Sequence, residues 1–100
     1  MATPVMSMAD LGEGETACVR VQGLEVLVSQ VHGQFYAVHA QCSHAAQSLA
    51  HGKVRGTQVS CPLHGAKFDI RTGECLAAPA QIPLTRFPVF IEAGKVCIEI

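Results

Sequence analysis

The 100-residue sequence has no tryptophan, one tyrosine and few charged residues, which make up 15% of the chain. It also lacks a long apolar run, since no stretch approaches the roughly 18 residues that a membrane-spanning helix needs. Hydrophobic residues nonetheless make up 49% of the chain, which is typical of a globular domain. We therefore expect a single domain over residues 1–100 with no membrane span.

Clusters of basic residues are also missing, and the formal net charge is −1. A nucleic-acid-binding domain needs a basic stripe to neutralise phosphates, so this balance argues against that class. Nor does so small a net charge predict strong electrostatic steering of a partner. Asp10, Glu13 and Glu15 form a small acidic group. Without a nearby histidine or serine constellation, we interpret it as a solvated loop.

The first eight residues contain no basic residue, so they lack the charged n-region of a secretory signal. We therefore expect a cytoplasmic protein. Five cysteines in a reducing compartment predict metal ligands or buried thiols rather than a disulfide framework. We expect three of them, Cys18, Cys75 and Cys97, to be small buried or half-buried side chains.

Helical periodicity is absent, and short runs of alternating or β-branched residues lie between turn signals. Pairs such as Gln22-Gly23 and His32-Gly33 predict tight hairpin turns. Pro88 predicts a sheet edge or a bulge, because proline cannot donate to a strand ladder. After one helical turn near residues 9–11, the pattern predicts strands over residues 16–21, 24–31, 34–39, 53–55, 58–60, 67–70, 75–77, 86–92 and 95–100. The expected fold class is all-β, a sandwich or barrel-like arrangement.

Two short motifs, Cys42-Ser43-His44 and Cys61-Pro62-Leu63-His64, carry the candidate chemistry. Each supplies one thiolate and one imidazole, so together they complete a four-ligand metal site. Two soft thiolates and two borderline imidazoles suit either a tetrahedral zinc ion or an iron–sulfur cluster with mixed ligands. The spacing alone does not separate these possibilities.

The two motifs resemble the Rieske signature, in which two histidines replace two cysteines on one iron of a [2Fe–2S] cluster. Residues 65–69, which follow His64, resemble the second cluster-binding loop of that family. The resemblance implies one [2Fe–2S] cluster, with Cys42 and Cys61 on one iron and His44 and His64 on the other. It also implies an antiparallel β sandwich with a small cluster-binding part, here about residues 41–80.

Within the family, the chain is most similar to the small Rieske ferredoxins of bacterial aromatic-ring-hydroxylating dioxygenases. Respiratory Rieske subunits carry an extra disulfide, whose positions correspond here to Gln47 and Leu63. They also place two hydroxyl groups near the cluster, where this sequence has Ala66 and Phe68. Fewer hydrogen bonds to sulfur stabilise the reduced cluster less. We therefore expect a potential towards the low end of the Rieske range, about −150 mV.

The resemblance implies an electron carrier and not an enzyme: electrons pass singly from a flavin-dependent ferredoxin reductase to a terminal oxygenase, leaving beside His44 and His64. One alternative is the small subunit of an assimilatory nitrite reductase-type enzyme, and a remote one is a zinc-stabilised binding module. His51 lies between the motifs and is the substitute ligand if one assignment is wrong. We interpret Lys53, Arg55 and Lys67 as solvated surface charges, with docking as the less favoured interpretation.

Overall fold

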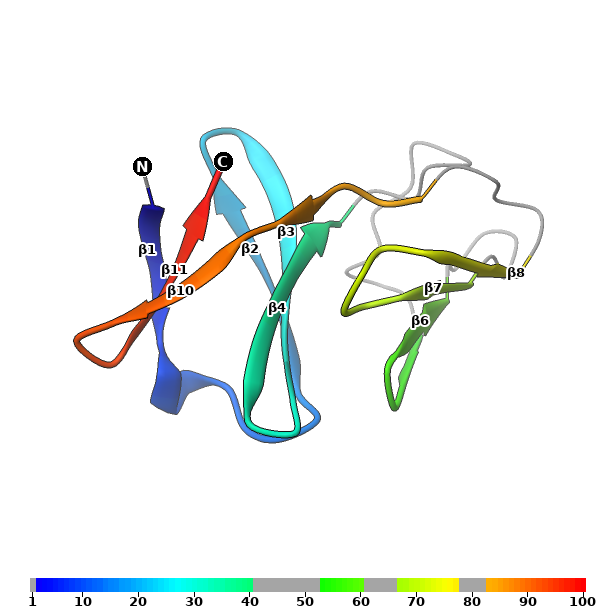
Figure 1. Ribbon diagram of the computed structural model, residues 1–100, viewed down its shortest axis with the longest axis horizontal. Coiled ribbons are helices and arrows are strands. Elements are labelled where there is room, and N and C mark those ends of the chain that lie inside the picture. The colour runs from blue at the N-terminus through cyan, green and yellow to red at the C-terminus, as the bar shows by residue number, and fades with distance from the viewer. Residues whose placement is uncertain (1, 41–52, 61–66, 78–82) are drawn as a thin grey trace.

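The computed structural model describes residues 2–40, 53–60, 67–77 and 83–100, which form three antiparallel sheets and one 3₁₀ turn (Figure 1). No helix in these ranges is long and apolar enough to cross a bilayer. The elements are β1 (Ala2–Ser7), η1 (Met8–Asp10), β2 (Thr16–Val21), β3 (Leu24–Val31), β4 (Gln34–His39), β5 (Lys53–Arg55), β6 (Gln58–Ser60), β7 (Lys67–Asp69), β8 (Cys75–Ala77), β9 (Arg86–Phe87), β10 (Val89–Glu92) and β11 (Lys95–Glu99).

The three sheets form layers along the long axis of the molecule (Figure 1). The outer sheet has the order β1-β11-β10, the central sheet β2-β3-β4-β9, and the inserted sheet β5-β6-β7-β8. In the sequence, the inserted sheet lies between β4 and β9, two neighbouring strands of the central sheet. The predicted all-β class with antiparallel sheets is therefore confirmed.

Successive side chains on a strand point to opposite faces of the sheet. The central sheet carries hydrophobic residues on both faces, and each face packs into a separate core. On β3, Val26 and Val28 pack into a core with Val96 and Ile98 of the outer sheet. The intervening Leu27 packs on the other face into a core with residues of the inserted sheet. This double burial explains why β3 has the longest run of buried residues among the described strands, Val26–Ser29.

Most predicted strands are confirmed with the same bounds. The predicted strands 67–70 and 95–100 end one residue earlier in the structure. Pro88 divides the predicted strand 86–92 into β9 and β10, which belong to different sheets. The sequence pattern did not predict β1, where the alternation is weak and Pro4 discourages a strand assignment; the strand pairs with β11 along the edge of the outer sheet.

Three hairpins turn on the residue pairs whose composition predicts tight turns. Gln22, His32 and Ala93 have φ values of 50°, 53° and 50°, and each is followed by a glycine that also has positive φ. Two consecutive residues with positive φ are typical of a type I′ turn, which matches the twist of antiparallel strands.

The acidic group near the N-terminus is exposed, as expected, but its members also accept backbone hydrogen bonds. Asp10 accepts from the N–H of Ser7 in a capping box. Glu13 accepts from the N–H groups of His32 and Gly33, at 2.6 and 2.9 Å, and so ties the loop after η1 to the β3–β4 turn. These two bonds lower the pKa of the Glu13 carboxyl.

The expectation for the three cysteines outside the ligand motifs is wrong in one case. Cys97 is buried and Cys75 is half-buried, but Cys18 is exposed. It lies on β2, an edge strand of the central sheet, on the face that also exposes Arg20. Partial burial and the nearby Glu25 carboxylate raise the pKa of the Cys18 thiol, while Arg20 lowers it to a smaller extent.

The inserted sheet is joined to the central sheet through a close contact between Gly73 and Leu84. Gly73 lies in the β7–β8 turn with φ +82°, and its carbonyl accepts the N–H of Leu84 at 2.8 Å. A Cβ at position 73 would lie 2.3 Å from the Leu84 carbonyl oxygen. The chain that returns to the central sheet therefore approaches too closely for any residue other than glycine.

Replacing Gly73 with alanine should destabilise the protein by more than the roughly 1–3 kcal/mol cost of a strained backbone, because the new methyl group also meets a backbone oxygen. Gly56→Ala is the matched control, since Gly56 has φ +57° but a Cβ added there would have no atom within 4 Å. Thermal unfolding followed by circular dichroism should show the larger loss of Tm for Gly73→Ala. Equal losses would contradict the close contact.

Glu13→Ala removes the carboxylate that accepts hydrogen bonds from the His32 and Gly33 amides. Hydrogen exchange of these two amides at pH 7 should therefore become about threefold to tenfold faster. Because the folded-state pKa is lowered, the carboxylate's contribution is complete above its ordinary pKa and is lost only as the pH falls through the lowered value. Exposed Glu92, whose carboxylate has no hydrogen bond among the described residues, provides the control Glu92→Ala. Unchanged exchange in Glu13→Ala would refute this link.

Candidate metal centre

The four predicted ligands, Cys42, His44, Cys61 and His64, lie outside the described residues, as does the substitute ligand His51. Their assignment therefore stays a prediction. The structure describes the strands to which the two ligand-bearing segments, residues 41–52 and 61–66, are attached. Those strands determine where the segments begin and end.

The inserted sheet brings the ends of both segments together. Its register pairs Lys53 with Ser60, Ser60 with Lys67, and Lys67 with Ala77. These four residues form one row, which we call the loop end of the inserted sheet. β5 begins there after segment 41–52, while β6 ends there and β7 begins there on either side of segment 61–66. Since directly paired residues lie about 4.5–5.5 Å apart, both ligand motifs are attached to the same end of one small sheet.

One face of the inserted sheet packs against the central sheet. Val54, Val59 and Phe68 form the row next to the loop end. Val59 and Phe68 are completely buried in the core that the two sheets share, and Val54 packs against it. This packing fixes the loop end relative to the central sheet.

A buried carboxylate stabilises the opposite end of the inserted sheet. Asp69, which is 8% exposed, accepts hydrogen bonds from the backbone N–H, Nε and Nη2 of Arg71 at 2.8, 3.2 and 3.0 Å. Burial raises the pKa of Asp69, but these bonds and the guanidinium charge lower it by more, so the net shift is downward. The backbone of Asp69 also bonds Gly73 and Glu74, which closes the β7–β8 turn.

Sequence reasoning predicted the strands on either side of this turn, residues 67–70 and 75–77, but missed the Asp69–Arg71 pair. The available signal was an acidic residue at the end of a buried strand followed two positions later by an arginine. A carboxylate there can accept backbone N–H groups of the turn as well as the guanidinium. We therefore assign this pair a structural role in shaping the turn.

The other histidines and cysteines do not form a second metal site within the described ranges. His32 is exposed in its turn, as expected, and His39 lies half-buried on β4. In residues 2–40, 53–60, 67–77 and 83–100, no three His, Cys, Asp or Glu side chains are placed to hold a metal ion. Candidate ligands are therefore concentrated in the two motifs.

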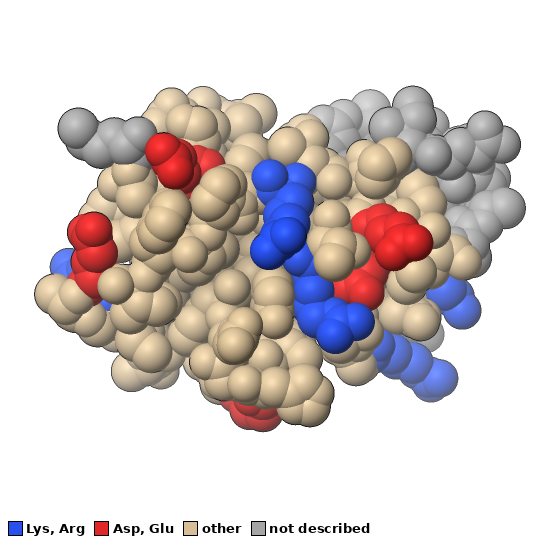
Figure 2. Space-filling view, viewed as in Figure 1, with Lys and Arg blue, Asp and Glu red and all other residues tan. Residues whose placement is uncertain are grey.

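The charged residues are distributed unevenly. Residues 41–80 contain four Lys or Arg and two Asp or Glu, a formal charge of +2, and the rest of the chain contains three and six, a charge of −3. On the face drawn in Figure 2, a band of Lys and Arg atoms runs down the middle and more lie at the lower right, while Asp and Glu atoms form patches at the left, at the bottom and on the right half beside the band. Segments 41–52, 61–66 and 78–82 contain no Lys, Arg, Asp or Glu, so the formally charged residues belong to the described strands and turns.

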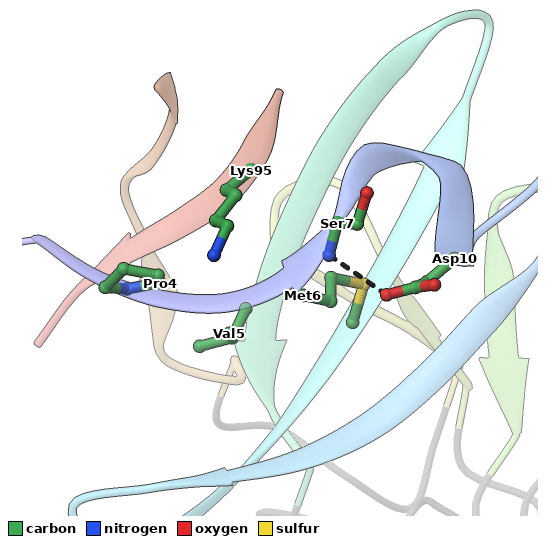
Figure 3. A pocket seen from close by; sticks show the side chains of 6 residues that line it. All are labelled: Pro4, Val5, Met6, Ser7, Asp10 and Lys95. Atoms are coloured by element: carbon green, nitrogen blue, oxygen red, sulfur yellow. Dashed lines mark hydrogen bonds between the residues drawn. The ribbon is translucent and has the colours of Figure 1, made fainter. Parts of the chain in front are cut away.

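A shallow groove of about 390 Å³ lies on the outer sheet, on the side of the molecule away from the inserted sheet (Figures 1 and 3). A bulge in β1 between Pro4 and Met6 helps to form it, and Ser7, Asp10 and Lys95 supply its polar lining. Figure 3 shows the Ser7 N–H bonded to Asp10, so this carboxylate already has a structural partner. The Ser7 hydroxyl likewise accepts the N–H of Ala9, so both side chains cap η1.

Comparisons with known proteins agree with this architecture. The family model for the Rieske [2Fe-2S] domain matches residues 1–88. The ferredoxin component of the naphthalene 1,2-dioxygenase system of Pseudomonas putida is 34% identical over 95 residues, which cover 95% of this chain and 91% of that protein.

Two solved structures show the same fold at comparable identity. The Sphingomonas yanoikuyae B1 ferredoxin has a TM-score of 0.91 and 35% identity, covering 100% of this chain and 99% of its own. A chain from the complex of reduced oxygenase and oxidized ferredoxin in carbazole 1,9a-dioxygenase has a TM-score of 0.89 and 33% identity, covering 97% and 91%.

The match to the family model covers most of the sequence, and the similarity to the naphthalene ferredoxin extends almost from end to end. The Rieske domain implies one [2Fe–2S] cluster, as the two motifs predict. This chain belongs to the Rieske [2Fe-2S] domain family.

Proposed function

We propose that this chain is the ferredoxin component of an aromatic-ring-hydroxylating dioxygenase system. It carries one electron at a time from a flavin-dependent reductase to a terminal oxygenase and catalyses no reaction itself. The observation that carries the proposal is the end-to-end similarity to a dioxygenase ferredoxin, at 34% identity over 91% of that protein. A similar ferredoxin, 33% identical, is known in a complex with its oxygenase.

We assign Cys42 and Cys61 to one iron of the cluster and His44 and His64 to the other. Two thiolates and two imidazoles are the donor set that a Rieske cluster requires, and the sequence offers them as two adjacent pairs. When bound, the cluster supplies one-electron redox chemistry. Attachment of both motifs to the loop end of one sheet supports this assignment.

The strands around the motifs have a positioning role in this proposal. Burial of Val59 and Phe68 fixes the loop end, and the Asp69–Arg71 pair fixes the turn at the other end. We therefore treat residues 41–80 as the cluster-binding part of a single domain over residues 1–100. Rigid attachment favours fast electron transfer, because the ligands need little rearrangement when the charge changes.

We place the protein in the cytoplasm. The three described cysteines, Cys18, Cys75 and Cys97, form no disulfide, which suits a reducing compartment. The small subunit of a nitrite reductase-type enzyme is the alternative with the same cluster. Stable co-purification with a large redox subunit would favour it over a diffusing carrier.

His44→Ala should abolish cluster binding, because loss of an imidazole leaves one iron short of a ligand, whereas His51→Ala should retain iron and visible absorption. Iron content measured on both purified variants checks the assignment. Retention of iron in His44→Ala together with its loss in His51→Ala would move the ligand to position 51.

The proposed function is tested by reconstitution with a flavin-dependent reductase and a terminal oxygenase encoded beside this chain. Addition of the protein should raise oxygenated product from the background rate to sustained, NADH-dependent turnover. The cluster-deficient His44→Ala variant is the matched control and should leave the background unchanged. Turnover that is equally fast without the protein would contradict a carrier role.

A further inference from the structure

We propose that the loop end of the inserted sheet is a cationic docking surface that fits a partner protein rich in Asp and Glu around its own redox site. The inference rests on the proposed function, since a carrier must bring its partner close to the ligand-bearing segments. It adds the sign of the charge that selects the partner. The net charge of −1 conceals this feature because acidic residues elsewhere outweigh it.

Acidic residues are missing from a long stretch around the predicted ligands. No Asp or Glu occurs between Glu25 and Asp69, and this interval contains all four predicted ligands. It also contains three cations, Lys53, Arg55 and Lys67. The sequence around both motifs is therefore positively charged without compensation.

The sheet register places this charge at the end where a partner would approach. Lys67 is exposed and lies in the loop-end row, directly before the part of β7 that packs into the core. Lys53 occupies the same row, on the other side of Ser60 of β6. Arg55 is exposed two positions further along β5, in the row that pairs with Gln58 and Asp69, so it lies at the opposite end of the sheet, about 7 Å away at 3.3 Å per residue.

The nearest acidic residues lie at the opposite end of the inserted sheet. Asp69 is buried and already bound by Arg71, so this pair contributes little net field. Glu74 directly precedes β8, and the far end of that strand, Ala77, lies in the loop-end row. Glu74 is therefore at the end of the sheet away from the ligand-bearing segments. By contrast, Lys67 and Arg55 form no ion pair with any residue that the structure describes.

Three of the remaining acidic residues, Asp10, Glu92 and Glu99, lie on or beside the outer sheet, and Glu25 of the central sheet is paired with Arg20. The long axis measures 40 Å, and the outer sheet and inserted sheet lie at its two ends (Figure 1). The screening length is about 10 Å at 0.1 M salt, so a partner at the loop end meets the local charge and not the net charge. Figure 2 shows Lys and Arg atoms on the half of the molecule that holds the inserted sheet, beside one patch of Asp and Glu atoms.

Small charged oxidants distinguish local charge from net charge. The reduced protein passes one electron to ferricyanide, giving ferrocyanide, or one electron to hexaammineruthenium(III), giving the ruthenium(II) complex. At pH 8, the rate with anionic ferricyanide should fall about threefold or more between roughly 0.02 and 0.5 M salt. The rate with the cationic oxidant should rise over the same range.

Charge-reversal variants locate the effect. Lys67→Glu should slow the reaction with ferricyanide at low salt by about threefold, and Arg55→Glu, at the opposite end of the inserted sheet, should slow it less. Lys95→Glu changes the net charge equally, but exposed Lys95 lies on β11 in the outer sheet, so it should leave the rate nearly unchanged. In a readout that does not use the cluster, Lys67→Glu should elute from a sulfopropyl resin at lower salt than Lys95→Glu. In the reconstituted dioxygenase assay, Lys67→Glu should likewise lose more turnover than Lys95→Glu.

A ferricyanide rate that rises with salt would overturn the proposal, as would equal effects of Lys67→Glu and Lys95→Glu in all three assays. The wild-type salt dependence needs no variant, so a misfolded variant does not remove the test. These results differ from failure of the carrier function. A protein with no cluster, or one that reacts with small oxidants but never supports oxygenase turnover, would refute the carrier role and leave the measured charge distribution standing.

Discussion

Burial of the central β2-β3-β4-β9 sheet on both faces is the constraint on which the rest of the structure depends. Its strands alternate between two cores, one shared with the outer sheet and one shared with the inserted sheet. Because the inserted sheet contributes one of these cores, it cannot rotate freely at the end of its connections. The fold therefore determines where both ligand-bearing segments leave the scaffold, before any ligand chemistry is considered.

Most of this scaffold was predictable from local sequence. The hairpin pairs, exemplified by His32-Gly33, require backbone conformations that few other sequences adopt, and alternation defined the strands between them. β1 was missed because its pairing with β11 depends on contact across almost the whole chain length. The prediction that Cys18 is buried was wrong for a related reason. Cys18 is exposed because β2 is an edge strand, and only the sheet order reveals this.

The predicted strands can be compared with the structure one by one, whereas the four predicted ligands lie outside the described residues. Two thiolates and two imidazoles in two short motifs resemble the Rieske signature and so predict the type of centre, and membership of the Rieske family agrees with that prediction. Contacts between residues distant in sequence could not be predicted in this way. The close approach of Gly73 to the Leu84 carbonyl forms only when the segment before β9 packs against the β7–β8 turn. No spacing of residues in the sequence predicts this contact. The charge at the loop end became visible only when the register aligned Lys53 with Lys67 across β6.

A Rieske centre is defined by two irons with unequal ligands, and this inequality is the central claim about the chain. The most direct measurement is iron and acid-labile sulfide content of the anaerobically purified protein, combined with electron paramagnetic resonance of its reduced form. Two irons and two sulfides per chain, with a rhombic signal at low average g that nitrogen ligation produces, are the predicted result. A colourless protein that contains zinc and no sulfide would contradict it.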